Sequence, residues 1–278
     1  MTTPDMRWAA RDCVTRAKNL LANGDDPSAR YACLELRFAI EYLSYDLLQT
    51  YRDELPYDAV KKWQPKEVIS EMRNVDPHAD ASSSLSVAME ATPGEPPPDE
   101  AWTSLGEEHR FSMPWANKNH NALGNYLHAP TIHHLESGSA ATVETIIARA
   151  TEVLNECEQI LNSSFYNSNF GNFFTFNCGD CKTQMRGRVK DPTQKQVVTC
   201  RKCHAVYDAE FGEGQKVTLT PHQLSYICAA PCRAENWIGT HLVKEGQRFV
   251  CETCGKRTKV VYGMVADDSE ASKPSVAE

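Results

Sequence analysis

The sequence lacks several features that would place the protein in a familiar class. No run of about 18 apolar residues occurs, so we expect no transmembrane helix. The N-terminal stretch MTTPDMRWAARDCV has no apolar core of a secretory signal, so we expect no export by that route. A phosphate-binding glycine loop, a nucleophile elbow and an H-E-x-x-H helix are also missing; LGEEH at 105–109 lacks the second histidine. These absences argue against P-loop nucleotide hydrolases, α/β-hydrolases and zincin proteases.

Charge is distributed unevenly along the 278 residues, whose formal net charge is −8. Residues 1–165 hold 14 Lys and Arg against 25 Asp and Glu, whereas residues 166–265 hold 14 against 8. The last thirteen residues hold 1 against 4. An acidic half joined to a basic half predicts two domains with different partners, with a protein as the possible partner of the acidic half.

Eleven cysteines are present, and eight of them fall into four close pairs. Within each set of two pairs, eighteen residues separate one pair from the next. Nothing marks the chain for export, so we expect reduced thiols that bind metal in the cytoplasm rather than disulfides. The first set is Cys178, Cys181, Cys200 and Cys203, and the second is Cys228, Cys232, Cys251 and Cys254.

Each pair can act as half of a metal site, because a tight turn points both thiolates at one ion. Zn²⁺ prefers four tetrahedral sulfur or nitrogen ligands, so two pairs complete one structural site. The sequence therefore predicts two Zn²⁺ ions. Equal spacers favour two sequential sites, and an interleaved pairing of the first pair with the third stays open.

The succession of cysteine turn, hairpin, cysteine turn and strand over about 170–264 resembles the zinc-ribbon class. In the simplest interpretation the ions only replace a hydrophobic core that is too small to form in so short a segment. Nucleic-acid binding, RNA or DNA, is the leading functional hypothesis for this half, and protein docking is the alternative. Cations near the turns could contact phosphates: Lys182, Arg186, Arg188, Lys190, Arg201, Lys202, Lys256 and Arg257.

Aromatic side chains in the basic half could stack on bases. The candidates are Phe173, Phe174, Tyr207 and Trp237.

Residues 1–165 predict a helical bundle. Helices are expected at about 4–22, 27–55, 116–128 and 140–162, with one or two shorter ones before residue 75. A flexible loop with a short strand at 84–91 is expected at 77–100. Asp26 is the expected N-cap of the second helix, and Pro56 its expected end. That helix carries two apolar stripes on nearly opposite faces, which predicts either a central position or a homodimer seam. The stripes are Leu36, Ile40, Leu43 and Leu47, and Tyr31, Leu34, Phe38, Tyr42 and Tyr45.

The stretch NKNHNALGNYLHAP at 117–130, together with the long helix, resembles HEPN-type helical bundles. Active members of that class cleave RNA without metal, using a histidine and an arginine five to seven positions before it, paired across a dimer. The resemblance makes His128 the candidate catalytic residue. The positions where the arginine is expected hold Asn121, Ala122 and Leu123, so this chain departs from the pattern, and we expect no efficient ribonuclease.

These observations predict a multidomain α plus small β fold. An acidic α-helical bundle (1–165) precedes two zinc-ribbon-like β modules (166–265) and a disordered acidic tail (266–278). The leading hypothesis is a zinc-binding nucleic-acid-binding or adaptor protein in the cytoplasm. A HEPN-like ribonuclease with the ribbons as substrate grip, and a protein-docking scaffold, are the alternatives.

Overall fold

The structure, a computed structural model, describes residues 5–212 and 216–262. The chain divides into two compact units, of which the first holds residues 1–177 and 184–189 and the second the remainder. A helical N-terminal region followed by small antiparallel sheets confirms the coarse fold prediction. The predicted boundary near residue 165 stays a prediction, and the predicted tail at 266–278 lies outside the described residues.

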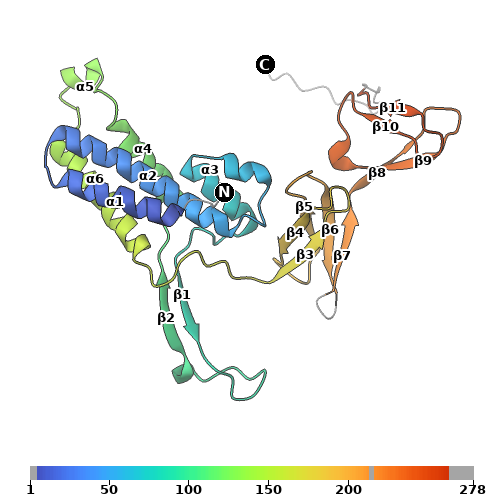
Figure 1. Ribbon diagram of the computed structural model, residues 1–278, viewed down its shortest axis with the longest axis horizontal. Helices are drawn as coiled ribbons and strands as arrows, with labels where there is room; N and C mark the ends of the chain where they lie inside the picture. Colours follow the sequence, from blue (N-terminus) through green and yellow to red (C-terminus); the bar gives the residue numbers. More distant parts are fainter. Residues whose placement is uncertain (1–4, 213–215, 263–278) are drawn as a thin grey trace, which may run out of the picture. The chain divides into compact units, whose positions relative to one another are not determined.

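The first unit is built around one long helix. This helix, α2, contacts four others along its length (Figure 1). A short helix α5 and the 3₁₀ turns η1 and η2 complete the helical elements that the structure describes in this unit. The bounds are α1 (Met6–Leu21), α2 (Asp26–Thr50), η1 (Tyr57–Lys61), α3 (Pro65–Val75), η2 (Asp99–Ala101), α4 (Met113–Asn125), α5 (Ile132–Glu136) and α6 (Val143–Leu161).

Both ends of α2 differ from the prediction. The N-cap is Asp25 rather than Asp26, because the Asp25 carboxylate accepts a hydrogen bond from the Ser28 N–H at 2.9 Å. The helix ends at Thr50, ahead of Pro56, where the chain tightens into a turn. Tyr51 in that turn is fully buried and donates its hydroxyl to Asp76 Oδ2 at 2.8 Å. Tyr51, the C-cap residue, is thus anchored in the core ahead of the proline.

The two stripes of α2 have different surroundings. Leu36 and Ile40 of the first stripe are fully buried in the bundle core. In the second stripe Tyr31 is 62% exposed and Phe38 is 40% exposed. Four neighbouring helices account for the buried stripe, so the stripe pattern alone does not require a second subunit. The homodimer through α2 stays a prediction.

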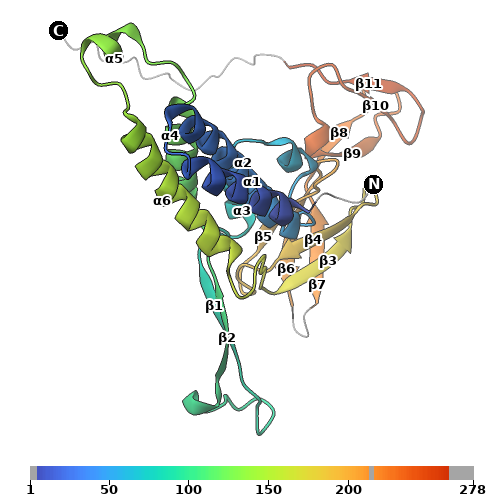
Figure 2. The same cartoon turned by 60° about the vertical axis from the view of Figure 1, so that its left-hand side comes forward.

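A β-hairpin projects from the bundle where a flexible loop was predicted. Strand β1 (Ser83–Val87) pairs antiparallel with β2 (Thr103–Glu108), with an irregularity between Leu85 and Ser86. The strand predicted at 84–91 is thus present but shorter, and its partner strand was missed. Both views show this hairpin, residues 83–108 and hereafter the arm, extending away from the helices (Figures 1 and 2).

A second hairpin of the first unit, β3 (Phe173–Asn177) with β4 (Gln184–Arg188), is tied to the bundle through Arg188. Arg188 Nε lies 3.3 Å from Glu54 Oε2, and Nη2 lies 3.3 Å from Asp76 Oδ2. The Arg188 side chain is only 11% exposed. A buried cation with two carboxylates is stabilised by charge-assisted hydrogen bonds, which fix the hairpin on the turn after α2.

The second unit consists of small antiparallel sheets. Strands β5 (Gln196–Thr199), β6 (Val206–Phe211) and β7 (Val217–Pro221) form one three-stranded sheet. Strand β8 (Gln223–Ile227) pairs with β9 (Glu235–Gly239), and β10 (Arg248–Val250) pairs with β11 (Arg257–Lys259). A 3₁₀ turn, η4 (Thr240–Leu242), follows β9. Among the described residues, no helix is both long and apolar enough to span a bilayer.

Candidate metal centres

All four cysteine pairs sit on the same kind of backbone turn. In the first, the Cys178 N–H donates to the Thr183 carbonyl at 2.9 Å, and the Lys182 N–H donates to the Cys178 carbonyl at 3.0 Å. The turns at Cys200 and Cys251 repeat both bonds, while the turn at Cys228 is one residue longer. Each turn ends with a positive φ, at Lys182, His204, Arg233 or Gly255. This local geometry brings the two thiols of each pair to one side.

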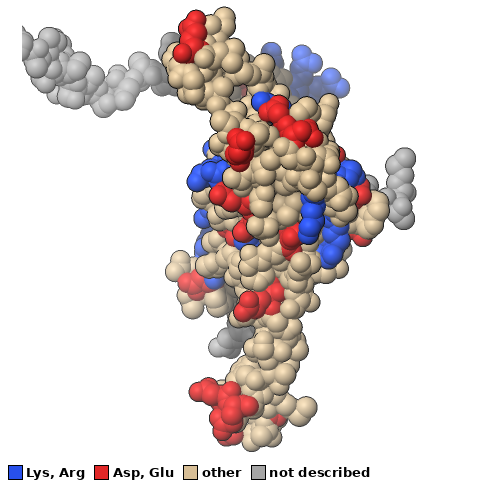
Figure 3. Space-filling model, turned by 90° about the vertical axis from the view of Figure 1, so that its left-hand side faces the viewer, with Lys and Arg blue, Asp and Glu red and all other residues tan. Residues whose placement is uncertain are grey.

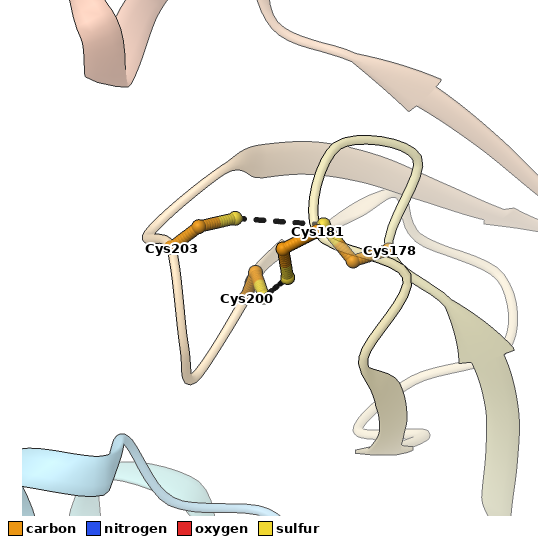
Figure 4. A group of neighbouring side chains, drawn as sticks. All are labelled: Cys178, Cys181, Cys200 and Cys203. Atoms are coloured by element: carbon orange, nitrogen blue, oxygen red, sulfur yellow. Dashed lines mark hydrogen bonds between the residues drawn. The ribbon is translucent and has the colours of Figure 1, made fainter.

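The first set of cysteines converges from two of these turns (Figure 4). The Sγ atoms of Cys178 and Cys203 lie 3.6 Å apart, and those of Cys181 and Cys200 also lie 3.6 Å apart. A disulfide would bring two sulfurs to about 2.05 Å, so these are free thiols. Four sulfurs around one tetrahedral ion with metal–sulfur bonds of about 2.3 Å lie about 3.8 Å apart. The arrangement therefore fits one metal ion.

The second set repeats this geometry. Cys228 and Cys254 have their Sγ atoms 3.8 Å apart, as do Cys232 and Cys251. In each set all four sulfurs lie within 4.8 Å of one another. The grouping is sequential, first pair with second and third with fourth, so the interleaved alternative is wrong.

A tyrosine on β6 supports the first set from outside. The Tyr207 hydroxyl lies 3.2 Å from Cys178 Sγ and accepts a hydrogen bond from the Gly179 N–H at 2.9 Å. Burial raises the pKa of Cys178, but hydrogen bonds from Tyr207 and from the N–H groups of the turn outweigh it, and the net pKa is lowered. Tyr207 is buried, so it braces a ligand and is not the stacking surface that we predicted.

The thiols differ in how readily they ionise. A hydrogen bond with the Thr183 hydroxyl lowers the pKa of Cys181 to about 6. The backbone N–H of Cys254 likewise lowers the pKa of Cys251 to about 6. Burial raises the pKa of Cys203 to about 12. Each set thus contains at least one thiol that is ionised near neutral pH and could start metal capture, after which the cation would displace the remaining protons.

A histidine and an aspartate form a pair next to the first set of cysteines. His241 Nε2 is 3.2 Å from Asp180 Oδ2, and the His241 side chain is only 7% exposed. Asp180 belongs to the first cysteine turn and His241 to η4, so this contact ties the segment after β9 to the first centre. With four sulfurs already gathered, His241 holds the turn and does not complete the ligand set.

The predicted phosphate-binding cations have several different environments. Arg188 is committed to the buried ion pairs described above, and Arg186 places its guanidinium 3.6 Å from the centroid of the Phe173 ring. Both lie on β4 in the first unit. The Lys182 amine donates to the Gly179 carbonyl of its own turn. Arg188 therefore has a structural role, and we leave it out of any nucleic-acid surface.

The other predicted cations belong to the second unit. Arg201 is half-buried, whereas Lys190, Lys202, Lys256 and Arg257 are exposed. Of the remaining stacking candidates, Phe174 is buried, while Trp237 on β9 is 60% exposed.

The hairpin of β10 and β11 gathers cations on one face. Arg248 lies directly opposite Lys259, and Val250 directly opposite Arg257, so all four share a face of the ribbon. Phe249 points to the other face, where its ring centroid is 6.2 Å from that of Tyr226. Arg248, Arg257 and Lys259 are exposed and form no ion pair within the described ranges. Like charges directly opposite each other destabilise a strand pair, so this face favours an anion.

His128 lies beyond the end of α4, fully at the surface, in a shallow pocket of about 330 Å³. Sequence reasoning missed a cation there: Arg30, from α2, lines the same pocket together with His134. Arg30 is already engaged, since its Nε lies 2.7 Å from Asp26 Oδ2 and its Nη1 bonds the Tyr126 carbonyl. His133 and His134 lie in α5.

Comparisons of the chain with protein-family models, with curated protein sequences and with solved structures find no significant match. The resemblance to HEPN bundles thus has no family match behind it. Arg248 escaped the sequence analysis, which also assigned Tyr207 to base stacking rather than to the support of Cys178. If the segments RFV (248–250) and RTK (257–259) had been interpreted as the two strands of a hairpin, their pairing would have placed Arg248 beside Lys259.

Proposed function

We propose that the chain is a zinc-binding protein with two zinc-ribbon-like modules, of which the second contacts nucleic acid. The four-sulfur geometry supports zinc, because thiolate-only tetrahedral sites suit Zn²⁺ and a closed site of four protein ligands is structural rather than catalytic. The basic face of β10 and β11 carries the functional part of the proposal. Arg248, Arg257 and Lys259 lie together there without counter-charges among the described residues.

The first module offers a weaker surface for a polyanion. Lys195 lies 2.9 Å from Asp208 Oδ2 and 3.3 Å from Glu210 Oε1, and His222 lies 2.8 Å from Asp208 Oδ1. The Lys195 ammonium is therefore neutralised by two carboxylates of β6. In the second module Trp237, exposed on β9, adds a surface on which a base could stack. We place the phosphate contacts in the second module, and Trp237 favours single-stranded nucleic acid.

The test is a salt titration of binding. Labelled single-stranded RNA, single-stranded DNA and duplex DNA are bound to the zinc-loaded chain and to the variant Arg248→Ala/Arg257→Ala/Lys259→Ala. Each lost phosphate contact should lower the slope of log K against log salt by roughly 0.7–0.9. The matched control replaces three cations of the helical unit, Lys66→Ala/Lys118→Ala/Arg149→Ala, and should keep the slope.

Metal content is measured on the same samples. Two zinc ions per chain in all three proteins would show that the variants are loaded and folded in the ribbon region. An unchanged slope in the triple variant of β10 and β11, with zinc retained, would contradict the nucleic-acid proposal and favour protein docking by these modules.

A further inference from the structure

The arm exposes apolar side chains that nothing in its own unit covers. Met89 is 87% exposed, Trp102 and Leu105 are each 49% exposed, and Val87 is 46% exposed. Within the described part of the chain, β1 and β2 pair only with each other. An isolated two-stranded ribbon is at best marginally stable in water. The arm is therefore a surface that gains stability when a partner covers it.

The charge of the arm indicates what kind of partner fits. No Lys or Arg occurs between Arg73 and Arg110. The far end of the arm carries Glu90, Glu95, Asp99 and Glu100, and Figure 3 shows this end as an acidic cluster beyond a largely uncharged shaft. Trp102 follows directly after the 3₁₀ turn that holds Asp99 and Glu100. An acidic tip with an aromatic anchor fits an apolar recess with a cationic rim.

The same unit has such a recess on another side, at the N-terminal end of α1, the C-terminal half of α2 and η1. This recess, the Trp63 pocket, has a volume of about 450 Å³, within the range of ligand pockets. Its apolar wall includes Tyr45, Leu48 and Trp63, and its cations are Arg52, Lys61 and Lys62. No carboxylate lines it among the described residues.

Two cations of the Trp63 pocket, Lys61 and Lys62, are held only loosely by the chain's own carboxylates. Lys61 lies 2.6 Å from Asp58 Oδ1, with both side chains mostly exposed, and Lys62 lies 3.9 Å from Glu71 Oε1. Surface pairs of this kind contribute little and are easily exchanged for a better partner. The pocket can therefore accept the carboxylates of an incoming acidic segment.

The arm of the same chain is held away from this pocket. At the base of the arm Glu108 is 3% exposed, lies 2.8 Å from Arg110 Nη2 and accepts the Asn167 N–H at 2.7 Å. Gly106 packs so closely on Ser164 that a Cβ there would lie 2.3 Å from the Ser164 Cβ. This base fixes the direction of the arm, and both views show it pointing away from the helices (Figures 1 and 2). Because its tip cannot fold back, the arm can enter such a pocket only on another molecule.

We propose that a second copy of this chain is that molecule. Trp102 of one copy enters the Trp63 pocket of the other, and Asp99 and Glu100 pair with Lys61 and Lys62 at its rim. The two copies can do this for each other at once, which closes a symmetric dimer with two identical contacts.

Sedimentation velocity on the full-length zinc-loaded chain tests the proposal. We expect concentration-dependent dimers up to about 100 µM, a range in which weak interfaces are populated. Lys61→Glu/Lys62→Glu and Asp99→Lys/Glu100→Lys should each weaken self-association by about tenfold or more. Trp102→Ala should weaken it about 30-fold, the effect of losing a buried aromatic anchor.

Mixing the two charge-reversed variants provides the decisive result. One contact of the mixed dimer is then the original pair and the other is the reversed pair, so association should return to the level of the unmodified chain. Controls with reversed charge elsewhere in the unit, Lys118→Glu and Glu136→Lys, should dimerise normally.

Three outcomes would overturn the proposal. The first is an unmodified chain that stays monomeric over the whole concentration range, which would leave the pocket to an acidic segment of another protein. The second is a dimer that survives both reversals and is lost in Phe38→Glu, which would place the seam on α2. The third is a mixture of reversed variants that stays monomeric although each is folded by circular dichroism.

Discussion

His204 and Gly255 occupy the same position in two of the cysteine turns, and both have a positive φ, 64° for His204 and 70° for Gly255. A side chain in this region costs of order 1–3 kcal/mol, whereas glycine is nearly free of that strain. His204→Gly should therefore stabilise the zinc-loaded chain by about 1 kcal/mol, and Gly255→Ala should destabilise it by a similar amount. Thermal unfolding of the metal-loaded proteins measures both. A lower melting temperature for His204→Gly would mean that the imidazole makes a contact worth more than the strain.

The pocket beside His128 leads to a second expectation at this scale. Metal-free RNA cleavage needs a base for the ribose hydroxyl and a cation for the charge that develops on the phosphate. Arg30 lies in the pocket but is bonded to Asp26 and to backbone carbonyls. We predict no appreciable cleavage of structured or unstructured RNA by the chelated protein. Cleavage that disappears in His128→Ala, with the fold intact, would make the ribonuclease hypothesis the leading one.

The metal ligands could be predicted because each pair is local in sequence and its turn is fixed by bonds within six residues. The environment of His128 could not, because Arg30 reaches it from 98 positions away. The ion pairs of Arg188 could not be predicted either, because its partners are distant in sequence: Glu54 lies in the turn after α2, and Asp76 lies just after α3. Local spacing predicts ligands, whereas long-range packing decides which cations remain available.

At the scale of the element, two substitutions on α2 compare a core position with a surface position. Leu43 is 5% exposed and Phe38 is 40% exposed. Leu43→Glu places an unpaired charge in the bundle core and should cost several kcal/mol, enough to unfold the helical unit. Phe38→Glu should leave the unit folded. Far-UV circular dichroism with urea titration compares the two, and equal loss in both would mean that Phe38 is covered in solution.

The helices were predictable because 3.6-residue periodicity is a local signal. Their ends were less predictable, since the cap of α2 is Asp25 and its C-terminal end lies at Tyr51, which makes a tertiary contact with Asp76. The arm was not predictable as a hairpin. Its strands are separated by a proline-rich stretch of fifteen residues, 88–102, and the sequence of β2, TSLGEE, does not alternate between apolar and polar residues. A hairpin is predicted from two alternating segments joined by a short turn, and this sequence has neither feature.

For the whole molecule, the two kinds of core predict separate responses to metal removal. The hydrophobic core cluster consists of residues between Ala10 and Leu161, and it includes none of the eight paired cysteines. Chelation should therefore abolish the structure of the second unit while the helical circular dichroism signal persists. Loss of helicity on chelation would show that the two units unfold as one.

The pH dependence of zinc retention follows from the same thiols. The pKa values of Cys181 and Cys251 are lowered to about 6, so each set keeps at least one thiolate until the pH falls to that range. Zinc binding requires thiolates and is favoured above that range. Release should become steep below about pH 6, which a chromogenic zinc indicator would record. Release that is complete at pH 7.5 would contradict this assignment.

The arm has a further consequence for protease digestion. Trypsin cuts after Lys and Arg, and none occurs between Arg73 and Arg110, so the exposed arm offers trypsin no site. Residues 74–110 should leave a digest as one peptide. Proteases that cut after glutamate or after large apolar side chains should instead nick the native chain first at Glu90, Glu100 or Trp102. Slower nicking at these bonds as the protein concentration rises would record directly when the tip becomes covered.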